Sequence, residues 1–428
     1  MLNKPDAMST ADESAGASQR YAAREKRVAD AIALRQPDRV PLSYMSQFWH
    51  AKYAGITNRT AMYDYEALAA AVRRVALELQ PDAVVSPFGM TALGPTFELI
   101  GYRSYRWPGH GLPDDRPYQY IDHENMLGEE YDEFIQDPSW FCFTRYLPRV
   151  SDAYAPLAKL PQLAGHTSIR MPFYTANFGD PAVAAALGQI AEAGKEGMKM
   201  VVRALAFQEE LKGLGFPLGI SSTTTAPYDY FADYLRGSKG IMLDIYRRRD
   251  KLLEAMEKLV PMLIRDAVTW SSRSPCKIVM VPLHWGIDGF MSIEQFKSLY
   301  WPQLRKVIIG LIDNGITPLV FWEGCCDSRM EIIADVPKGK CIYWLERSDI
   351  FRAKAILGDV VCLRGGVPAA MLMGGTPAEI RDCCQKLIQV VGRGGGFMLD
   401  ASVGIPAESR SENVFAMFQA VRDFGRYD

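Results

Sequence analysis

The 428-residue chain has little net charge, no long apolar run and only five histidines. Its formal net charge of −2 gives no support for binding to nucleic acid or to an anionic membrane surface. No apolar run reaches the length of a membrane-spanning helix. Residues 1–25 are polar and rich in Ala and Ser, without the apolar centre of a secretion signal. We therefore expect a cytoplasmic protein that binds neither nucleic acid nor membrane.

The sequence also lacks nucleotide-binding motifs, and its cysteines give no indication of disulfide bonds. The chain contains neither a G-x-G-x-x-G fingerprint nor a Walker A pattern, so we expect no nucleotide-binding loop. Eight cysteines in a chain of this length, without a secretion signal, are typical of reduced thiols. What the chain does have is an ordinary composition, 48% hydrophobic and 23% charged, which is sufficient to bury a large core.

Eight short apolar runs have the length and composition of β-strands, and helical patterns lie between most of them. The expected strands are residues 40–46, 82–87, 217–223, 276–283, 317–323, 340–346, 360–366 and 396–402. The clearest expected helices are residues 65–80, 241–271 with an interruption at Pro261, 293–314, 376–391 and 411–424. This alternation predicts the α/β class and a single (β/α)8 barrel of the TIM type.

The regular alternation is broken between the second and third expected strands by a long segment rich in Trp, Tyr, Pro and Gly. We interpret residues 90–210 as an insertion that covers the mouth of the barrel as a lid. Its aromatic side chains would either stack on a flat ligand or simply pack the lid. Residues 1–30 are expected to form a flexible N-terminal arm and residues 31–428 the barrel with its insertion.

Several expected strands end in a polar or charged residue just before a turn. The C-terminal ends of the strands of a parallel barrel meet on one face, where barrel enzymes place their chemistry. His284, Glu323 and Asp400 each end a strand, and we predict that they act as catalytic acids or bases. The alternatives are a hydrogen-bonded core histidine, an ion pair of Glu323 with an arginine, and a helix cap or ion pair for Asp400.

Other polar and aromatic residues near the expected strand ends are candidates for binding a substrate. Hydroxyl and aromatic groups orient polar or flat ligands, and arginines bind anionic groups. The same residue types also satisfy loop backbone or form plain ion pairs. The predicted substrate-binding residues are His50, Thr224, Tyr228, Asp229, Trp322, Arg329 and Arg364.

Five segments resemble, in order, signatures of the uroporphyrinogen decarboxylase superfamily. They are RQPDRVPL at 35–42, GDVVCLRGGV at 358–367, GGTPAEI at 374–380, GGGFML at 394–399 and ENV at 412–414. The resemblance implies a (β/α)8 barrel, usually a homodimer. It also implies one of two chemistries, which are cofactor-free decarboxylation of a porphyrinogen and methyl transfer between a corrinoid and an acceptor, often with zinc.

The chain departs from both patterns of that superfamily. The arginine-rich loop that grips the porphyrinogen carboxylates is replaced by SQFWHAKY at 46–53. The second zinc-binding cysteine position falls near Val403, which leaves His284, Glu323 and Cys325 as a weak, mixed set of metal ligands. The segment HWGIDGFMS at 284–292 resembles the corrinoid methyltransferase branch more than the porphyrin branch.

Two enzymatic functions follow from this resemblance, together with a non-catalytic binding barrel as a third reading. The first is transfer of a methyl group between a small methylated substrate and either a corrinoid on a partner protein or tetrahydrofolate. The alternative is a cofactor-independent decarboxylase or lyase acting on a small acid, such as an aromatic one, held by Arg329 or Arg364. A cluster of ionisable groups at the strand ends favours an enzyme over the binding barrel.

Overall fold

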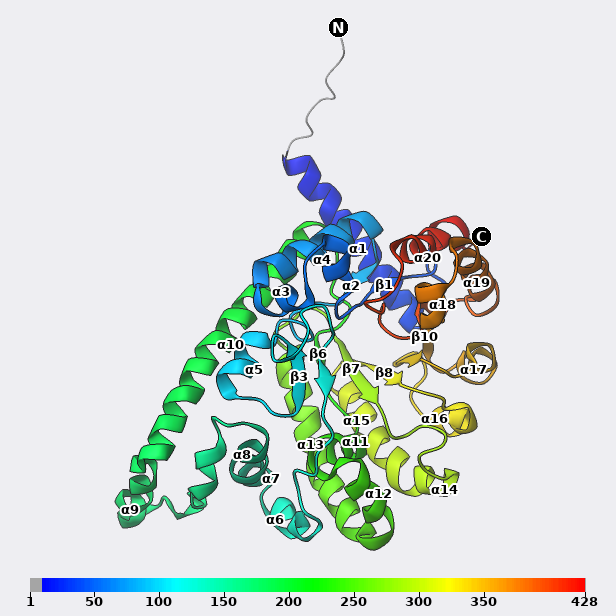
Figure 1. Ribbon diagram of the computed structural model, residues 1–428. Helices are drawn as coiled ribbons and strands as arrows, with labels where there is room; N and C mark the ends of the chain where they lie inside the picture. The colour runs from blue at the N-terminus through cyan, green and yellow to red at the C-terminus, as the bar shows by residue number, and fades with distance from the viewer. Residues whose placement is uncertain (1–9, 428) are drawn as a thin grey trace.

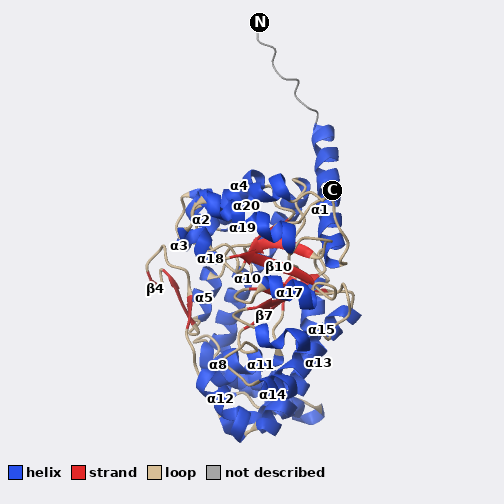
Figure 2. Ribbon diagram, turned by 90° about the vertical axis from the view of Figure 1, so that its right-hand side faces the viewer, coloured by secondary structure: helices blue, strands red, loops and turns tan. Residues whose placement is uncertain are grey.

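The centre of the protein is a parallel sheet with helices packed around it (Figures 1 and 2). A computed structural model describes residues 10–427. Six strands lie in the order β11-β10-β9-β8-β7-β6, and β1 pairs with β2. The strands are β1 (Ser43–Tyr44), β2 (Ala83–Val84), β6 (Ser222–Thr223), β7 (Ile278–Leu283), β8 (Thr317–Trp322), β9 (Ile342–Leu345), β10 (Cys362–Val367) and β11 (Phe397–Ala401). The fold is therefore α/β, as predicted.

Each of the eight expected strand segments contains a strand, but three of them are short. β1, β2 and β6 hold two residues each. The carbonyls of Pro41 and Pro217 accept hydrogen bonds from the backbone N–H groups of Leu399 and Val84, so pairing continues outside the regular strands. Isolated parallel bridges join Leu42 to Leu399 and Val84 to Leu218, so the short strands still contact the ends of the six-stranded sheet.

Helices follow most of the strands, and the expected ones are confirmed with one difference. They are α4 (Tyr65–Leu79), α12 (Gly237–Arg247), α13 (Arg249–Ser271), α14 (Ile293–Gln295), α15 (Trp301–Asp313), α16 (Met330–Ile333), α17 (Ile350–Leu357), α18 (Ala369–Gly374), α19 (Pro377–Val390) and α20 (Ser411–Phe424). Pro261 lies inside the continuous helix α13, and the break falls instead at Arg248, where φ is −141°. A π-helix, η8 (Phe296–Tyr300), joins α14 to α15.

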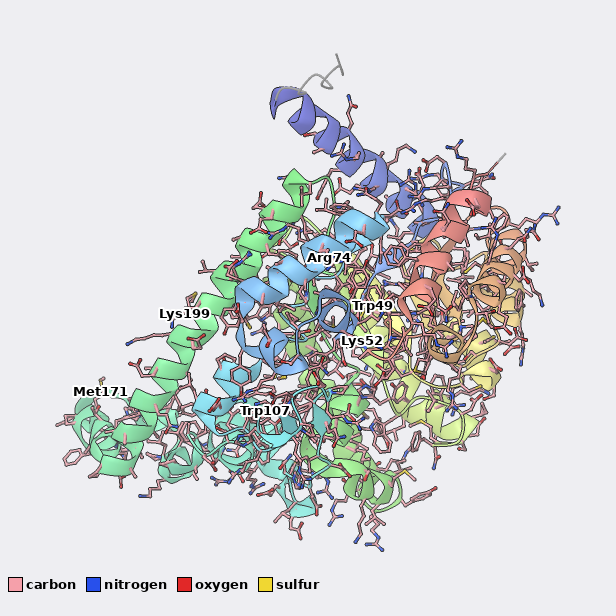
Figure 3. The ribbon with its side chains drawn as sticks, turned by 45° about the horizontal axis from the view of Figure 1, so that its top comes forward. Trp49, Lys52, Arg74, Trp107, Met171 and Lys199 are labelled. Atoms are coloured by element: carbon pink, nitrogen blue, oxygen red, sulfur yellow. The ribbon has the colours of Figure 1, made fainter. Side chains whose placement is uncertain are left out.

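The segment between β2 and β6 holds a small three-stranded sheet and many short helices. Its elements include α5 (Gly94–Ile100), β3 (Tyr105–Pro108), β4 (Gly111–Leu112), β5 (Gln119–Tyr120), α6 (Tyr131–Gln136), α7 (Pro138–Phe141), α8 (Leu147–Val150), α9 (Met171–Thr175) and α10 (Pro181–Gly213). The long helix α10 forms one edge of the molecule, with α9 beyond its first turn (Figure 1). Figure 3 marks this edge by Lys199 on α10 and Met171 on α9.

Helix α1 (Thr10–Ile32) packs against the end of the sheet at which the strands begin. Its Val28 and Ala31 belong to the same apolar cluster as the interior side chains of β7 to β11. Arg27 forms ion pairs with Asp38 and Asp82, which precede β1 and β2. Residues 10–30 of the expected arm therefore lie in a helix that is held by charge and apolar contacts, and residues 1–9 lie outside the described residues.

The apolar core divides into two layers because side chains alternate along each strand. Met280, Phe321 and Met398 point to the interior cluster. Their neighbours Val281 and Trp322 belong to the outer cluster, between the strands and the helices. The position of a residue within this alternation decides whether its side chain reaches the interior side of a strand end. Within the described residues, no helix has the length and apolar character needed to cross a membrane.

Candidate active site

His284 and Glu323 continue the interior faces of β7 and β8. Met280 on β7 and Phe321 on β8 point to the interior, and a period of two places the residues four and two positions later on the same side. Leu283 and Trp322 pair across the two strands and point outward. The structure thus brings His284 and Glu323 together, with Nε2 of the imidazole 3.5 Å from Oε1 of the carboxylate.

A second carboxylate holds the other side of the imidazole ring. Nδ1 of His284 lies 2.7 Å from Oδ2 of Asp233, whose Oδ1 accepts a hydrogen bond of 2.7 Å from the indole of Trp285. Burial opposes a charged ring, but the hydrogen bonds to Asp233 and Glu323 outweigh it and raise the pKa of His284 to about 11. The ring is therefore an imidazolium at neutral pH, held between two carboxyl groups.

Asp229 holds the backbone of His284 in this cluster. It ends α11 (Pro227–Asp229), and the π-helix η7 (Tyr230–Arg236) carries Asp233 one turn later. Oδ2 of Asp229 accepts hydrogen bonds from the backbone N–H of His284 at 2.9 Å and from the Tyr300 hydroxyl at 3.0 Å. Complete burial, together with the nearby charge of Asp233, raises the pKa of Asp229 to about 7. Asp229 thus fixes the backbone that carries His284.

A cavity of about 350 Å³ opens beside His284 and Asp233. Its wall contains four tyrosines, three of them from the segment between β2 and β6. The lining residues are Gln47, Tyr105, Tyr118, Tyr120, Asp233, Tyr234 and His284. The hydroxyl of Tyr120 donates to the backbone carbonyl of Asp233, which ties this wall to η7. Neither lysine nor arginine occurs among the described residues that line the cavity.

The other predicted catalytic residue, Asp400, is not brought to this cluster. It is fully buried and forms an ion pair with Arg364, whose Nε donates to Oδ2 at 2.9 Å. The guanidinium lies over the ring of Trp344, 4.2 Å from its centroid. Burial raises the pKa of Asp400 to about 6, although Arg364 acts in the opposite direction. Neither partner of this pair is among the described residues that line the cavity.

Arg329 and Trp322 are also occupied elsewhere. Arg329 is buried, forms an ion pair with Asp288 and donates to the carbonyl of Met291 at 2.7 Å. Trp322 is fully buried in the outer layer, where its ring meets that of Tyr343 at 5.8 Å between centroids. Both side chains therefore contribute to packing around β8 rather than to the cavity beside His284.

The remaining predicted binding residues contact buried protein groups. Nδ1 of His50 lies 3.3 Å from the hydroxyl of Tyr44, and burial lowers the pKa of His50 to about 3. The hydroxyl of Thr224 lies 3.5 Å from the carbonyl of Leu263. Tyr228 is buried, with its ring 5.6 Å from that of Tyr300 between centroids.

The weak metal set predicted from the sequence is not gathered. Sγ of Cys325 lies 3.5 Å from Oδ2 of Asp288. Across residues 10–427, no three His, Cys, Asp or Glu side chains are arranged so that they could hold a metal ion. The described residues therefore do not fit a zinc site, and we derive no step through zinc.

Six residues that line the cavity were not predicted individually from the sequence. They are Gln47, Asp233 and the tyrosines of the cavity wall, Tyr105, Tyr118, Tyr120 and Tyr234. Asp229 and Asp233 are four residues apart, which places both on one face of a helix and is a signal that the sequence does contain. The abundance of Tyr in the segment between β2 and β6 also indicated an aromatic lid, but it did not indicate which tyrosines reach the cavity.

Comparisons with known proteins agree on one family. The model of the Uroporphyrinogen decarboxylase (URO-D) family matches residues 168–424. The uroporphyrinogen decarboxylase of Pseudomonas aeruginosa (strain UCBPP-PA14) is 24% identical over 192 residues, which cover 44% of this chain and 52% of that protein. The enzyme of the same name from Coxiella burnetii (strain RSA 331 / Henzerling II) is 25% identical over 184 residues, covering 42% and 49%. The chain thus spans about half the length of these relatives.

A solved structure is similar over nearly the whole chain. It is a methyltransferase from Methanosarcina mazei, with a TM-score of 0.60 and 13% sequence identity, and the match covers 94% of this chain and 98% of the other. At this level of identity, the similarity is one of fold.

Proposed function

Because the chain belongs to the uroporphyrinogen decarboxylase family, we propose that it is an enzyme of methyl transfer within that family. It would move a methyl group between a small methylated substrate and either a corrinoid on a partner protein or tetrahydrofolate. The observation that carries this proposal is the cluster of Asp233 on η7 with His284 and Glu323 at the ends of β7 and β8, beside an aromatic cavity. The similarity in fold to a methyltransferase also supports the proposal of methyl transfer.

The cavity does not suit a porphyrinogen with its many carboxylates. Such a substrate needs several cations, and the described lining residues include neither lysine nor arginine. The alternative of a decarboxylase acting on a small acid needs a free guanidinium. Arg329 and Arg364 are buried in ion pairs with Asp288 and Asp400, so that alternative has no support from the geometry.

In the proposed reaction His284 is the proton donor. Asp233 orients the ring through Nδ1, and Nε2 lies 3.5 Å from Oε1 of Glu323. When the heteroatom of the substrate releases its methyl group, it keeps the electron pair of the broken bond and takes the proton from Nε2. A bound corrinoid or folate supplies the nucleophile that accepts the methyl group. Asp229 and Glu323 hold the donor in place.

The proposal includes the closed (β/α)8 barrel as the scaffold of the site. The bridges Leu42–Leu399 and Val84–Leu218 lie where β1 would meet β11 and where β2 would meet β6. Residues 90–210 would then be the lid, since Tyr105, Tyr118 and Tyr120 reach the cavity beside His284. A cytoplasmic location, which we also propose, agrees with eight free cysteines, all within the described residues.

Replacement of Glu323 by Gln tests the assignment together with the activity. The assay mixes the enzyme, a methylated substrate and a corrinoid protein, and follows the appearance of the methylcobalamin spectrum. We expect the rate to fall by about 10²- to 10⁴-fold, because Gln keeps the shape but cannot hold a positive imidazole by charge or exchange a proton. Since Glu323 pairs with His284 and not with the arginines, the urea midpoint should stay close to that of the parent.

Glu331→Gln is the matched control for this experiment. Glu331 lies on α16 with an exposed side chain, pairs with Arg352 and does not line the cavity in the described structure. We expect this variant to have the parental rate. A normal rate with a lowered midpoint in Glu323→Gln would make Glu323 a structural residue.

We also propose that two copies of the chain associate. The resemblance to the family suggested a homodimer, and apolar side chains are exposed along α9 and α10, including Phe173 at 76% and Met198 at 61% of their accessible surface. Sedimentation equilibrium at micromolar concentrations should give a mass near twice 47.8 kDa. A mass near that of one chain over the whole concentration range would rule the dimer out.

A further inference from the structure

In the cavity wall, Tyr105 meets Tyr118 and Tyr120 at steep angles. The rings of Tyr105 and Tyr118 have centroids 5.6 Å apart and planes inclined by 86°. The rings of Tyr105 and Tyr120 are 5.5 Å apart and inclined by 66°. A slot for a flat aromatic ligand needs two nearly parallel faces. Rings inclined this steeply form no such slot, and the cavity beside them suits a compact, rounded group better than a flat one.

The charged cluster beside this cavity is negative on balance. Two carboxyl groups, Asp233 and Glu323, flank the single imidazole of His284, so the ionised cluster carries a formal charge of −1. Burial raises the pKa of Tyr105 to about 12, which keeps its phenol neutral at physiological pH. Neutral phenol rings present negative faces to a cation. The described residues that line the cavity supply no lysine or arginine to compete.

The wall and the charged cluster are also fixed relative to each other. Tyr120 donates its hydroxyl to the backbone carbonyl of Asp233, and Trp285 donates its indole N–H to the carboxylate of the same residue. A site whose aromatic and anionic parts are held together before binding loses less conformational entropy when the ligand arrives.

We propose that this cavity binds a methylated ammonium group, with the tyrosines around the cation and Asp233 as its counter-charge. The inference deepens the proposed function and rests on it in one respect, namely that the bound cation is the methyl donor. The C–N bond breaks, its electron pair remains on nitrogen, and the methyl group passes to the corrinoid or folate carrier. The neutral amine then takes a proton from Nε2 of His284 and leaves as a protonated amine.

Calorimetric titration of the full-length protein tests the binding without requiring turnover. The two probes are choline and its neutral carbon isostere, in which a tert-butyl group replaces the trimethylammonium group. We expect choline to bind at least about 10-fold more tightly, since a desolvated cation between aromatic faces gains this much over a neutral group. The ratio of the two affinities should approach one in Tyr105→Leu and in Asp233→Asn.

The ratio also guards against variants that fold poorly, because a reduced fraction of active protein affects both probes equally. Tyr105→Phe should keep most of the preference, because the ring remains. Tyr246→Leu is the control, since Tyr246 is exposed on α12 and does not line the cavity in the part of the chain that is described. Equal binding of both probes by the parent, or a preference that survives Tyr105→Leu and Asp233→Asn, would overturn the proposal.

The activity assay separates this inference from the proposed function. If choline is preferred through the tyrosines but no methylated amine transfers its methyl group to either carrier, the cation site stands and the methyl transfer fails. If a methyl ether is demethylated while choline shows no preference over its isostere, methyl transfer stands and the cation site is wrong.

Discussion

His284→Gln is expected to lower the rate of methyl transfer by about 10²- to 10⁴-fold, which is the usual contribution of a positioned general acid. Gln occupies similar space and can hydrogen-bond to Asp233, but it cannot be charged or give up a proton. At neutral pH the urea midpoint should fall only modestly, because His284 faces an open cavity with 42% of its side chain exposed and solvent screens the ion pair that is lost. Turnover and midpoint measured on the same sample decide the matter.

The control for His284→Gln is His123→Gln, because His123 is exposed and lies outside the described lining of the cavity. Both variants remove one imidazole, and only the first should lose activity. Equal rates for His284→Gln and the parent would remove His284 from the catalytic residues.

The pH dependence gives this prediction a second readout. Because the pKa of His284 is raised to about 11, the acid form persists through neutral pH and the rate should fall only toward that value. Asp233→Asn removes the strongest partner of the imidazolium, so the pKa of His284 falls toward its ordinary value. The basic limb of the pH–rate profile should therefore move to lower pH. A profile with an unchanged basic limb in Asp233→Asn would contradict the role of His284 as the acid.

The raised pKa of His284 also predicts how the stability of the protein changes with pH. The raised pKa means that folded protein binds this proton more tightly than unfolded protein does. The contribution of His284 to stability is complete below its ordinary pKa of about 6.5 and is lost as the pH rises toward about 11. Unfolding midpoints of the parent should thus decline between these values relative to those of His284→Gln.

The positions of the strands were predictable because they follow from local sequence patterns. β8 falls within the expected 317–323 because a buried apolar run ends at a carboxylate and a glycine. The extent of β1, β2 and β6 was not predictable to the same degree, since it depends on which partner strands offer hydrogen bonds. Helix α13 also passes through Pro261, because the packing of a long amphipathic helix outweighs one missing backbone donor.

In the candidate site, too, residues placed by local sequence patterns could be predicted, and residues placed by tertiary contacts could not. The alternation along β8 separates Trp322 from Glu323, so the sequence already contains the reason why only one of them faces the interior. Asp229 and Asp233 could have been read as one helical face. Tyr105 and Tyr118 could not be placed from the sequence, because the position of the segment between β2 and β6 depends on contacts far along the chain.

The buried pair of Arg364 and Asp400 gives the largest expected effect on stability. Asp400→Ala leaves the guanidinium buried without its carboxylate, and breaking such a pair typically costs about 3–5 kcal/mol. Arg364 is 1% exposed and Asp400 is fully buried, so water cannot replace the lost partner. We expect a strongly lowered urea midpoint, with the folded fraction retaining the parental rate per molecule, because the pair lies away from the described cavity lining.

Removing both charges at once is the matched control. Burial raises the pKa of Asp400 to about 6 in spite of Arg364, which means that the desolvation of the carboxylate outweighs the attraction of its partner. Arg364→Met combined with Asp400→Leu should therefore recover much of the midpoint that Asp400→Ala loses, because no buried charge is left without its partner. If Asp400→Ala instead kept the parental midpoint and lost turnover, Asp400 would return to the catalytic group, and the site would have to extend inward from His284 to β11.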